Sequence, residues 1–415
     1  MAASSKHTGI YISNYVDKQL FIQKLQAGTL LSGLDLSALK GVVFSDISLN
    51  DFIQEEVKHE HLEIVTDKNK GGLATMSSGQ QKKALIIYLL SKKPQYLILD
   101  DLFAFLDEEN RNELTQVLHN SKDETLIIQL FNRKNELLPF IETIFQHHEK
   151  TNSFVPKQLS DINSFTHHAV EADYQIPIYL KEQKAVNEIL IEFKNVSLSY
   201  DTKAVLNNIS WTIRKGEFWH LIGPNGSGKS TILSMINGDN PKAYGQEIYL
   251  FGRKKGSGET IWDIKANLGF YSSNMTFKFE RNETVENMVI SGFYDSVGLY
   301  IKPSDLQIHA VHEWLKLVDL YEFRKKSFHS LSFGLQRIVL IIRALIKQAP
   351  LLILDEPGAG LDEENMLMVS RLINKIVTER KTSILYVSHK EELGLTPNHI
   401  LKLTPGPEGS TAEII

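Results

Sequence analysis

The strongest constraint on this chain is an internal repeat. The segment MSSGQQKKALIIYLLSKKPQYLILDDLFAFLDEEN begins at Met76, and the segment LSFGLQRIVLIIRALIKQAPLLILDEPGAGLDEEN begins at Leu331. The two align without a gap at an offset of 255 residues. Similarity over this length indicates a duplicated structural unit. The 415 residues therefore predict two related domains, each long enough to bury a core of its own.

Each copy of the repeat predicts a helix followed by a buried strand. In the first copy Leu85, Tyr88 and Leu89 recur at helical spacing, and a proline separates them from the apolar run YLILDD. The second copy has the same order and ends in LLILDE. Apolar runs without alternating polar residues are typical of central strands in a parallel sheet that helices cover on both faces. The fold class is therefore predicted to be α/β.

A glycine-rich motif predicts where the second domain binds a ligand. GPNGSGKS lies between the apolar run FWHLIG and the helical segment STILSMIN, which is the setting of a phosphate-binding P-loop. Its glycines let backbone N–H groups and a helix N-terminus converge on a phosphate. The nucleotide-binding residues are expected to be Gly223, Pro224, Asn225, Gly226, Ser227, Gly228, Lys229, Ser230 and Thr231. Lys229 is expected to reach the β- and γ-phosphates of ATP, and Ser230 to bind Mg²⁺. A glycine-rich turn without a ligand is the alternative, which the flanking strand and helix disfavour.

Further motifs resemble the ATP-binding-cassette family of P-loop ATPases, over nearly the whole carboxy-terminal half. The resemblance implies that Asp355 organises magnesium and that Glu356 polarises the attacking water. It also implies that His389, directly after the apolar run TSILYV, contacts the γ-phosphate. Tyr200, placed 29 residues before Lys229, matches the aromatic residue that stacks on adenine.

Each of these residues has a simpler explanation when it is taken alone. Tyr200 could belong to the core, Asp355 and Glu356 could cap a helix, and His389 could lie exposed in a loop. Their occurrence together, in the family's order, favours the catalytic interpretation. One position departs from the family pattern, because Ser273 follows the run NLGFYS where the family usually has glutamine. This departure leaves open how magnesium is linked to the neighbouring helical region.

The amino-terminal half resembles a cassette whose phosphate loop has eroded. ISNYVDKQ occupies the place of GPNGSGKS, and it keeps a lysine, Lys18, but has lost every glycine. Without those glycines the backbone is not expected to wrap a phosphate. Lys18 and Lys229 are 211 residues apart, so the first copy is 44 residues shorter than the second before the repeat begins. The strands that usually frame adenine are the expected loss.

Two catalytic positions are also replaced in the first copy. Asp101 stands in the place of Glu356, and Asn132 in LFNRK stands in the place of His389. We therefore predict that this half does not hydrolyse ATP. Binding of a nucleotide by Lys18 in an unusual loop is the alternative.

The family resemblance further implies that each ATP lies between one P-loop and the signature motif of the other cassette. The first signature, MSSGQ, is nearly intact, so Ser77, Gly79 and Gln80 are expected to contact the nucleotide at a helix N-terminus. The second signature, LSFGL, is altered at two of five positions. The intact signature thus pairs with the intact P-loop. This pattern predicts one composite site formed by pairing of the two cassettes within the chain, while a homodimer stays open.

The predicted domains are a degenerate cassette at 1–150, a linker at 151–186 and a complete cassette at 187–415. Both cassettes are expected to be ATP-binding-cassette nucleotide-binding domains with the P-loop NTPase fold.

Charge and hydropathy limit the partners. With 45 basic and 50 acidic side chains the net charge is −5, which does not indicate nucleic-acid binding. The longest apolar runs are far below the roughly 18 residues of a membrane span, and the first residues do not resemble a secretory signal. The chain is therefore expected to be cytoplasmic, or peripheral at the inner face of the membrane.

Two stretches of the second half, FGRKKGSGETIWDIKANLGFYSS and VISGFYDSVGLY, resemble the tandem-cassette branch of molybdate-transport and photorepair type. The resemblance implies an ATP-binding component of a transport system, with a membrane-embedded transporter subunit as partner. The alternative is a soluble ATP-driven clamp that acts on nucleic acid or on a ribosome. No residue in the sequence identifies molybdate or another cargo.

Overall fold

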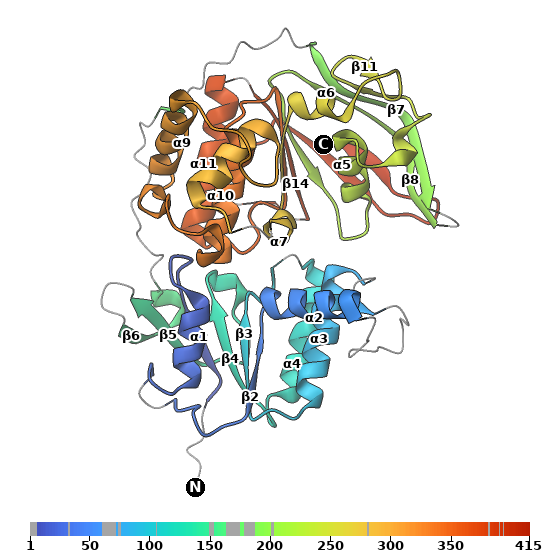
Figure 1. Cartoon of the computed structure of the whole chain (residues 1–415). Coiled ribbons are helices and arrows are strands. Elements are labelled where there is room, and N and C mark those ends of the chain that lie inside the picture. Colours follow the sequence, from blue (N-terminus) through green and yellow to red (C-terminus); the bar gives the residue numbers. More distant parts are fainter. Residues whose placement is uncertain are drawn as a thin grey trace. The chain divides into compact units, whose positions relative to one another are not determined.

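The computed structural model describes residues 6–31, 34–59, 72–73, 76–104, 106–148, 153–162, 175–177, 187–200, 203–279, 282–380, 382–389, 391–392 and 394–415. The chain divides into two compact units (Figure 1). The first lies mainly within residues 1–166 and the second mainly within residues 167–415. Of the expected linker, 151–152, 163–174 and 178–186 lie outside the described residues.

The first unit is built on one six-stranded sheet. Its elements are β1 (Thr8–Tyr11), α1 (Lys18–Gln26), β2 (Gly41–Phe44), α2 (Asp46–His59), α3 (Ser78–Ser91), β3 (Tyr96–Asp100), α4 (Glu108–Ser121), β4 (Leu126–Phe131), β5 (Thr143–His148) and β6 (Ser153–Lys157). The strand order is β2-β3-β4-β1-β5-β6. All neighbours are parallel except β5 and β6. Strand β6 carries the sheet past residue 150, where we expected the linker to begin.

Helices cover both faces of this sheet, as the apolar character of β3 predicts. Leu97 packs in a cluster with Leu85 of α3 and Leu114 of α4. Its neighbour Ile98 packs in a separate cluster with Phe21 of α1. Adjacent side chains of a strand point to opposite faces, so α1 lies on one face and α3 and α4 lie on the other (Figure 1).

The second unit has a six-stranded sheet of the same topology and a further sheet. Its strands are β7 (Ile189–Tyr200), β8 (Lys203–Arg214), β9 (Phe218–Ile222), β10 (Ile248–Leu250), β11 (Arg253–Lys254), β12 (Leu268–Ser272), β13 (Leu351–Asp355), β14 (Ser383–Ser388), β15 (His399–Thr404) and β16 (Thr411–Ile414). Its α-helices are α5 (Lys229–Asn237), α6 (Ile261–Ala266), α7 (Met275–Lys278), α8 (Val285–Ile290), α9 (Asp305–Leu317), α10 (Phe333–Leu345) and α11 (Glu363–Arg380). The sheet orders are β12-β13-β14-β9-β15-β16 and β11-β10-β7-β8.

The duplication predicted from the repeat is confirmed by these two topologies. Strands β2, β3, β4, β1, β5 and β6 occupy the same order as β12, β13, β14, β9, β15 and β16, and in both sheets the last strand alone is antiparallel. Within its described residues, the first unit has no counterpart of the four-stranded sheet, in line with its 44-residue shortfall before the repeat. The α/β P-loop fold with two related units is therefore present.

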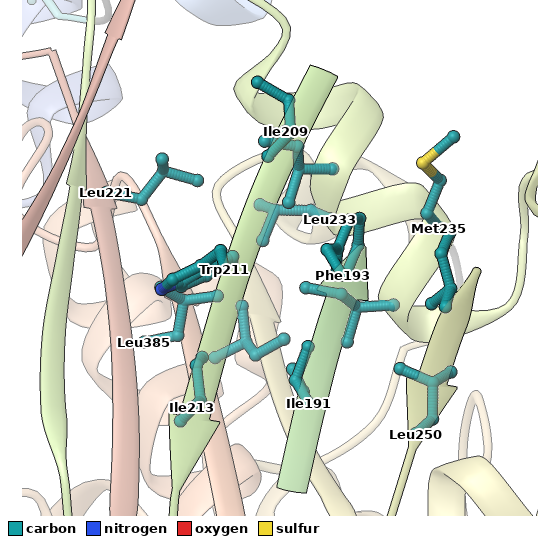
Figure 2. Packing of buried hydrophobic residues seen from close by; sticks show 14 of the residues in the cluster. Ile191, Phe193, Ile209, Trp211, Ile213, Leu221, Leu233, Met235, Leu250 and Leu385 are labelled. Carbon is teal, nitrogen blue, oxygen red and sulfur yellow. The ribbon is translucent and has the colours of Figure 1, made fainter. Parts of the chain in front are cut away.

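One apolar core joins the P-loop helix to both sheets of the second unit. Figure 2 shows this core with side chains from β7, β8 and β10 facing those of α5. The labelled residues are Ile191, Phe193, Ile209, Trp211, Ile213, Leu221, Leu233, Met235, Leu250 and Leu385. Because Leu221 and Leu385 belong to the six-stranded sheet, α5 packs between the two sheets, and its N-terminus is fixed relative to β7.

No helix in the described part of the chain is long and apolar enough to span a bilayer.

Candidate functional site

The P-loop of the second unit has the backbone conformation that its glycines permit. Strand β9 ends at Ile222 and helix α5 begins at Lys229, so the motif spans the turn between them. Gly226 and Gly228 have φ angles of 78° and 92°, a region that residues with a side chain rarely adopt. Gly228 is also the N-cap of α5 and offers no side-chain oxygen to the first amides of the helix. Those amides, and the positive end of the helix dipole, are therefore available to an anion.

Lys229 lies at the first position of this helix and points back into its own loop. Its ammonium group donates to the carbonyl oxygens of Gly223 (2.6 Å) and Pro224 (3.1 Å). The side chain is buried. The lysine is thus held against the loop that it is predicted to serve, with Ser230 exposed and Thr231 half-buried in the same first turn of α5.

Asp355 lies at the end of β13, directly beside the end of β12. The two strands are parallel and pair Ser272 with Asp355, and the Ser272 hydroxyl donates to Asp355 Oδ2 (3.1 Å). Burial and the carboxylate of Glu356 raise the pKa of Asp355 to about 6, while the Ser272 hydrogen bond and the Lys229 ammonium act against this rise. The sequence singled out Ser273 at this point. Its backbone N–H donates to the Asp355 carbonyl (3.3 Å), while the hydroxyl that reaches the Asp355 carboxylate belongs to its neighbour Ser272.

Glu356 and His389 form a pair at the carboxyl ends of β13 and β14. His389 Nδ1 lies 3.2 Å from both carboxylate oxygens of Glu356. Glu356 has a φ angle of 52°, and its counterpart Asp101 in the first unit has 48°. Both copies therefore keep a left-handed residue after the acidic end of the strand, a conformation that costs energy and occurs often at functional sites.

His220 is a buried residue of this region that the sequence did not single out. It lies in β9, and its Nε2 is 2.8 Å from the hydroxyl of Ser388, which directly precedes His389. Burial lowers the pKa of His220 to about 4, against the opposing effect of Glu356. The ring is therefore neutral at pH 7 and braces the strand end that carries His389. A histidine inside an apolar strand before a P-loop was the available signal.

Tyr200 is the last residue of β7, and 42% of its surface is exposed. It therefore belongs to the four-stranded sheet that packs on α5, and its ring is accessible to a ligand.

The corresponding loop of the first unit is filled by the protein's own charges. Lys18 begins α1 after β1, in the position that Lys229 has before α5. Here the N-cap is Asp17, whose carboxylate accepts a hydrogen bond from the amide of Leu20 (3.0 Å). The Lys18 ammonium lies 2.8 Å from Asp100 Oδ1 and 3.0 Å from Asp101 Oδ1.

These contacts replace the two interactions that a phosphate makes in a P-loop. Asp17 supplies negative charge at the helix N-terminus, and the two strand-end carboxylates neutralise Lys18. Although burial acts to lower the pKa of Lys18, Asp100 and Asp101 raise it above its usual value. Burial raises the pKa of Asp100 to about 6 against the effect of Lys18.

The first signature motif forms the N-terminus of α3. Ser77 is the N-cap and accepts from the amide of Gln80, while the Gln80 side chain accepts from the amide of Ser77. This reciprocal arrangement is a capping box. A Cβ at Gly79 would lie 2.4 Å from the side chain of Asn110, so any larger residue there requires the Asn110 side chain to move.

Comparisons with known proteins agree with this geometry. A family profile described as ABC transporter matches residues 206–359. The ABC transporter ATP-binding protein ModF of Escherichia coli (strain K12) is 36% identical over 331 residues, covering 76% of this chain and 67% of that protein. The chain belongs to the ATP-binding-cassette family. It is an ATPase of this family and binds ATP.

Two further matches have lower sequence identity. An uncharacterised ABC transporter ATP-binding protein of Schizosaccharomyces pombe (strain 972 / ATCC 24843) is 29% identical over 328 residues, covering 77% of this chain and 66% of that protein. The chain thus spans about two thirds of the length of both relatives. A model of ribosome-bound archaeal Pelota and ABCE1 is similar with a TM-score of 0.65 at 18% identity, covering 99% of this chain and 74% of that chain. At this identity the similarity shows a shared fold.

Proposed function

We propose that the chain hydrolyses MgATP at one composite site, formed by the P-loop of the second cassette and the signature of the first. The contrast between the two lysines carries this proposal. Lys229 begins a helix whose N-terminus has no side-chain cap, whereas Lys18 is neutralised by Asp100 and Asp101 behind a helix capped by Asp17. One loop can receive phosphate and the other is already occupied by protein charges.

Magnesium fits the residues at the proposed site. Asp355 is buried beside a second carboxylate, Glu356, and such crowded negative charge favours a bound cation. The Ser230 hydroxyl and the Asp355 carboxylate are oxygen ligands, which Mg²⁺ prefers. Among the described residues no three acidic or histidine side chains gather to hold a metal by themselves. The remaining ligands would therefore come from ATP phosphates and water, and the ion would neutralise phosphate charge when it is bound.

The chain's own groups account for the rest of the chemistry. Lys229 supplies positive charge to the β- and γ-phosphates, and the first-turn amides of α5 bind them as hydrogen-bond donors. Glu356 accepts the proton of the attacking water. His389, whose Nδ1 lies 3.2 Å from the Glu356 carboxylate, contacts the γ-phosphate, as the family resemblance implies. Ser77 and Gln80 present a second helix N-terminus, which favours the negative γ-phosphate.

The composite site is tested by placing charge at Ser77 without breaking its helix cap. Aspartate and asparagine both cap helices about as well as serine, so Ser77→Asp and Ser77→Asn form a matched pair. The aspartate would repel the γ-phosphate, and steady-state ATP hydrolysis is expected to fall at least about tenfold. The asparagine variant should stay within a few-fold of the parent. Substitution of Gly79 is less informative, because its side chain would collide with Asn110.

Ser332→Asp, in the second signature, provides the comparison across the two cassettes. It should cost much less activity than Ser77→Asp, because its signature is paired with the loop that Lys18 and its carboxylates fill. A larger loss from Ser332→Asp would instead indicate that two second cassettes from separate chains pair with each other. Lys229→Ala is expected to abolish hydrolysis and weaken ATP binding, and undiminished turnover would exclude the P-loop as the site.

We further propose that this ATPase is the energy-supplying component of a transport system, with a membrane-embedded subunit as partner. The similarity to ModF supports this role, and molybdate as cargo rests on that relative alone. The whole-chain fold similarity to ribosome-bound ABCE1 favours a second candidate, an ATP-driven clamp on a ribosome. Purification of the tagged chain in ATP with the Glu356→Gln substitution separates these roles. Co-purification of an integral membrane subunit supports transport, and co-sedimentation with ribosomes supports the clamp.

A further inference from the structure

A chain of hydrogen bonds joins the P-loop helix to the hydroxyl of Tyr200. Asn240 follows α5, and its Nδ2 donates to the Tyr200 hydroxyl (2.9 Å) and to Ser234 Oγ (3.1 Å). The Ser234 hydroxyl donates to the carbonyl of Thr231 (2.8 Å), in the first turn of α5. The backbone amide of Asn240 also donates to the carbonyl of Ser234 (3.0 Å). The tyrosine hydroxyl is therefore connected to the same turn that carries the expected phosphate ligands.

The orientation of the Asn240 amide is determined by its partners. Its Oδ1 accepts from the backbone N–H of Lys242 (3.0 Å), and an N–H group can only donate. The oxygen must face Lys242, so the NH₂ group must face Tyr200 and Ser234. Asn240 is 4% exposed, and a flipped amide would set its NH₂ group against the Lys242 N–H and lose that bond inside a buried site. Asn240 is thus a rigid connection.

The ring of Tyr200 is covered on one face. The Lys242 ammonium lies 4.7 Å from the ring centroid, and it also donates to the carbonyl of Ser199. With 42% of the residue exposed, the ring still offers surface on which a flat ligand can stack.

We infer that Asn240 is a positioning residue for the purine base of the nucleotide. It keeps the Tyr200 ring at a set distance from the P-loop, so that one rigid ligand can stack its base on the ring while its phosphates reach the first turn of α5. This inference rests on the proposed assignment of Tyr200 and Lys229 to the nucleotide. Its specific content is that the tyrosine hydroxyl, and not the aromatic ring alone, contributes to binding through Asn240. Loss of this connection weakens the binding of ligands that contain a base and leaves the binding of ligands without a base unchanged.

Tyr200→Phe tests the inference, because it keeps the ring and removes only the hydroxyl. Affinities of the full-length chain are measured for MgATP and for magnesium tripolyphosphate, which has the three phosphates and no base. The loss of one hydrogen bond is expected to weaken ATP binding about twofold to fivefold and leave tripolyphosphate binding unchanged. Tyr244→Phe is the matched control, because that exposed ring also has a lysine over its face but lies outside the hydrogen-bond chain. It should bind both ligands as the parent does.

Asn240→Leu provides an independent arm. It is expected to weaken ATP binding to a similar extent, and the double variant with Tyr200→Phe should be no weaker than the weaker single variant, since both remove one shared bond. If Asn240→Leu fails to fold, Tyr200→Phe still decides the matter, because its ring lies at the surface.

Unchanged ATP affinity in Tyr200→Phe overturns the inference. An equal loss of affinity for ATP and for tripolyphosphate also overturns it, because the tyrosine hydroxyl would then stabilise the phosphate loop and not the base. Two further variants separate this failure from that of the proposed site. If Tyr200→Ala binds ATP normally while Lys229→Ala does not, the P-loop site stands and the base platform is wrong. If Lys229→Ala also binds ATP normally, the proposed site itself is wrong.

Discussion

Replacing Lys18 by methionine keeps a side chain of similar length in the first unit but removes the positive charge that lies beside two buried carboxylates. The side chains of Lys18, Asp100 and Asp101 are 10%, 7% and 7% exposed, and the two ion-pair distances are 2.8 and 3.0 Å. An exposed ion pair would contribute at most about 1 kcal/mol. Removal of one partner from a buried pair typically costs about 3–5 kcal/mol, because the other charge stays buried without compensation. We therefore expect the first unit to lose about 3 kcal/mol or more at pH 7.

The loss should depend on pH in a defined direction. Burial already raises the pKa of Asp100 to about 6 with Lys18 beside it, and without the lysine this pKa rises further. A carboxyl whose pKa is raised in the folded state gains stability when it is protonated, and loses that stability as the pH rises through the folded-state pKa. The variant takes up its proton at a higher pH than the parent does. The stability gap between them should therefore narrow as the pH falls from about 8 to about 6.

The assay can observe the two units separately within the full chain. All four tryptophans, Trp211, Trp219, Trp262 and Trp314, lie in the second unit, so tryptophan fluorescence reports its unfolding by denaturant. Hydrogen exchange of peptides from β3 and β4 reports opening of the first unit. Lys18→Met should accelerate exchange in those strands and leave the fluorescence transition in place.

Lys24→Met is the control on the exposed side of the same helix and should change stability by less than about 0.5 kcal/mol. Adding Asp100→Asn to Lys18→Met should restore part of the lost stability, because the uncompensated charge of the Asp100 carboxylate is then removed as well. Unchanged exchange in Lys18→Met at pH 7 would refute the reasoning, since it would mean that Lys18 is not committed to the ion pair. In that case calorimetry should find two tightly bound ATP molecules per chain. Our proposal requires one bound ATP per chain in both the parent and the variant.

Two further predictions concern the second unit. Glu356→Gln should bind ATP as the parent does and hydrolyse it about a hundredfold or more slowly, because the amide cannot accept the proton of water; equal losses in affinity and rate would indicate a structural role. Ser272→Ala should move the acidic limb of the ATPase pH profile to higher pH, because burial and Glu356 raise the pKa of Asp355 and the Ser272 hydrogen bond opposes that rise. Activity falls as the pH drops through this pKa, since only the ionised Asp355 carboxylate favours a cation. An acidic limb that does not move would show that another group limits the rate at low pH.

The duplication, the fold class and the P-loop could be predicted from the amino-acid sequence. These features depend on local patterns, namely a repeat without gaps, apolar runs of strand length, and glycines between a strand and a helix. The same patterns correctly placed Lys18 and Lys229 at equivalent helix starts. The sequence also located Glu356 and His389 at the ends of two strands, although the family resemblance was needed to suggest their roles.

Which charged and polar groups meet depends on the tertiary structure. Lys18 and Asp100 are 82 positions apart, and Ser272 and Asp355 are 83 apart, and in each case the packing of neighbouring elements brings them together. The loss of every glycine from the first loop predicted that it does not bind phosphate, but this loss could not show that Asp17, Asp100 and Asp101 take the place of the ligand. Such contacts depend on strand order and helix packing, which local propensity does not encode. For the same reason, the link from the P-loop helix through Asn240 to Tyr200 was visible only in the folded chain.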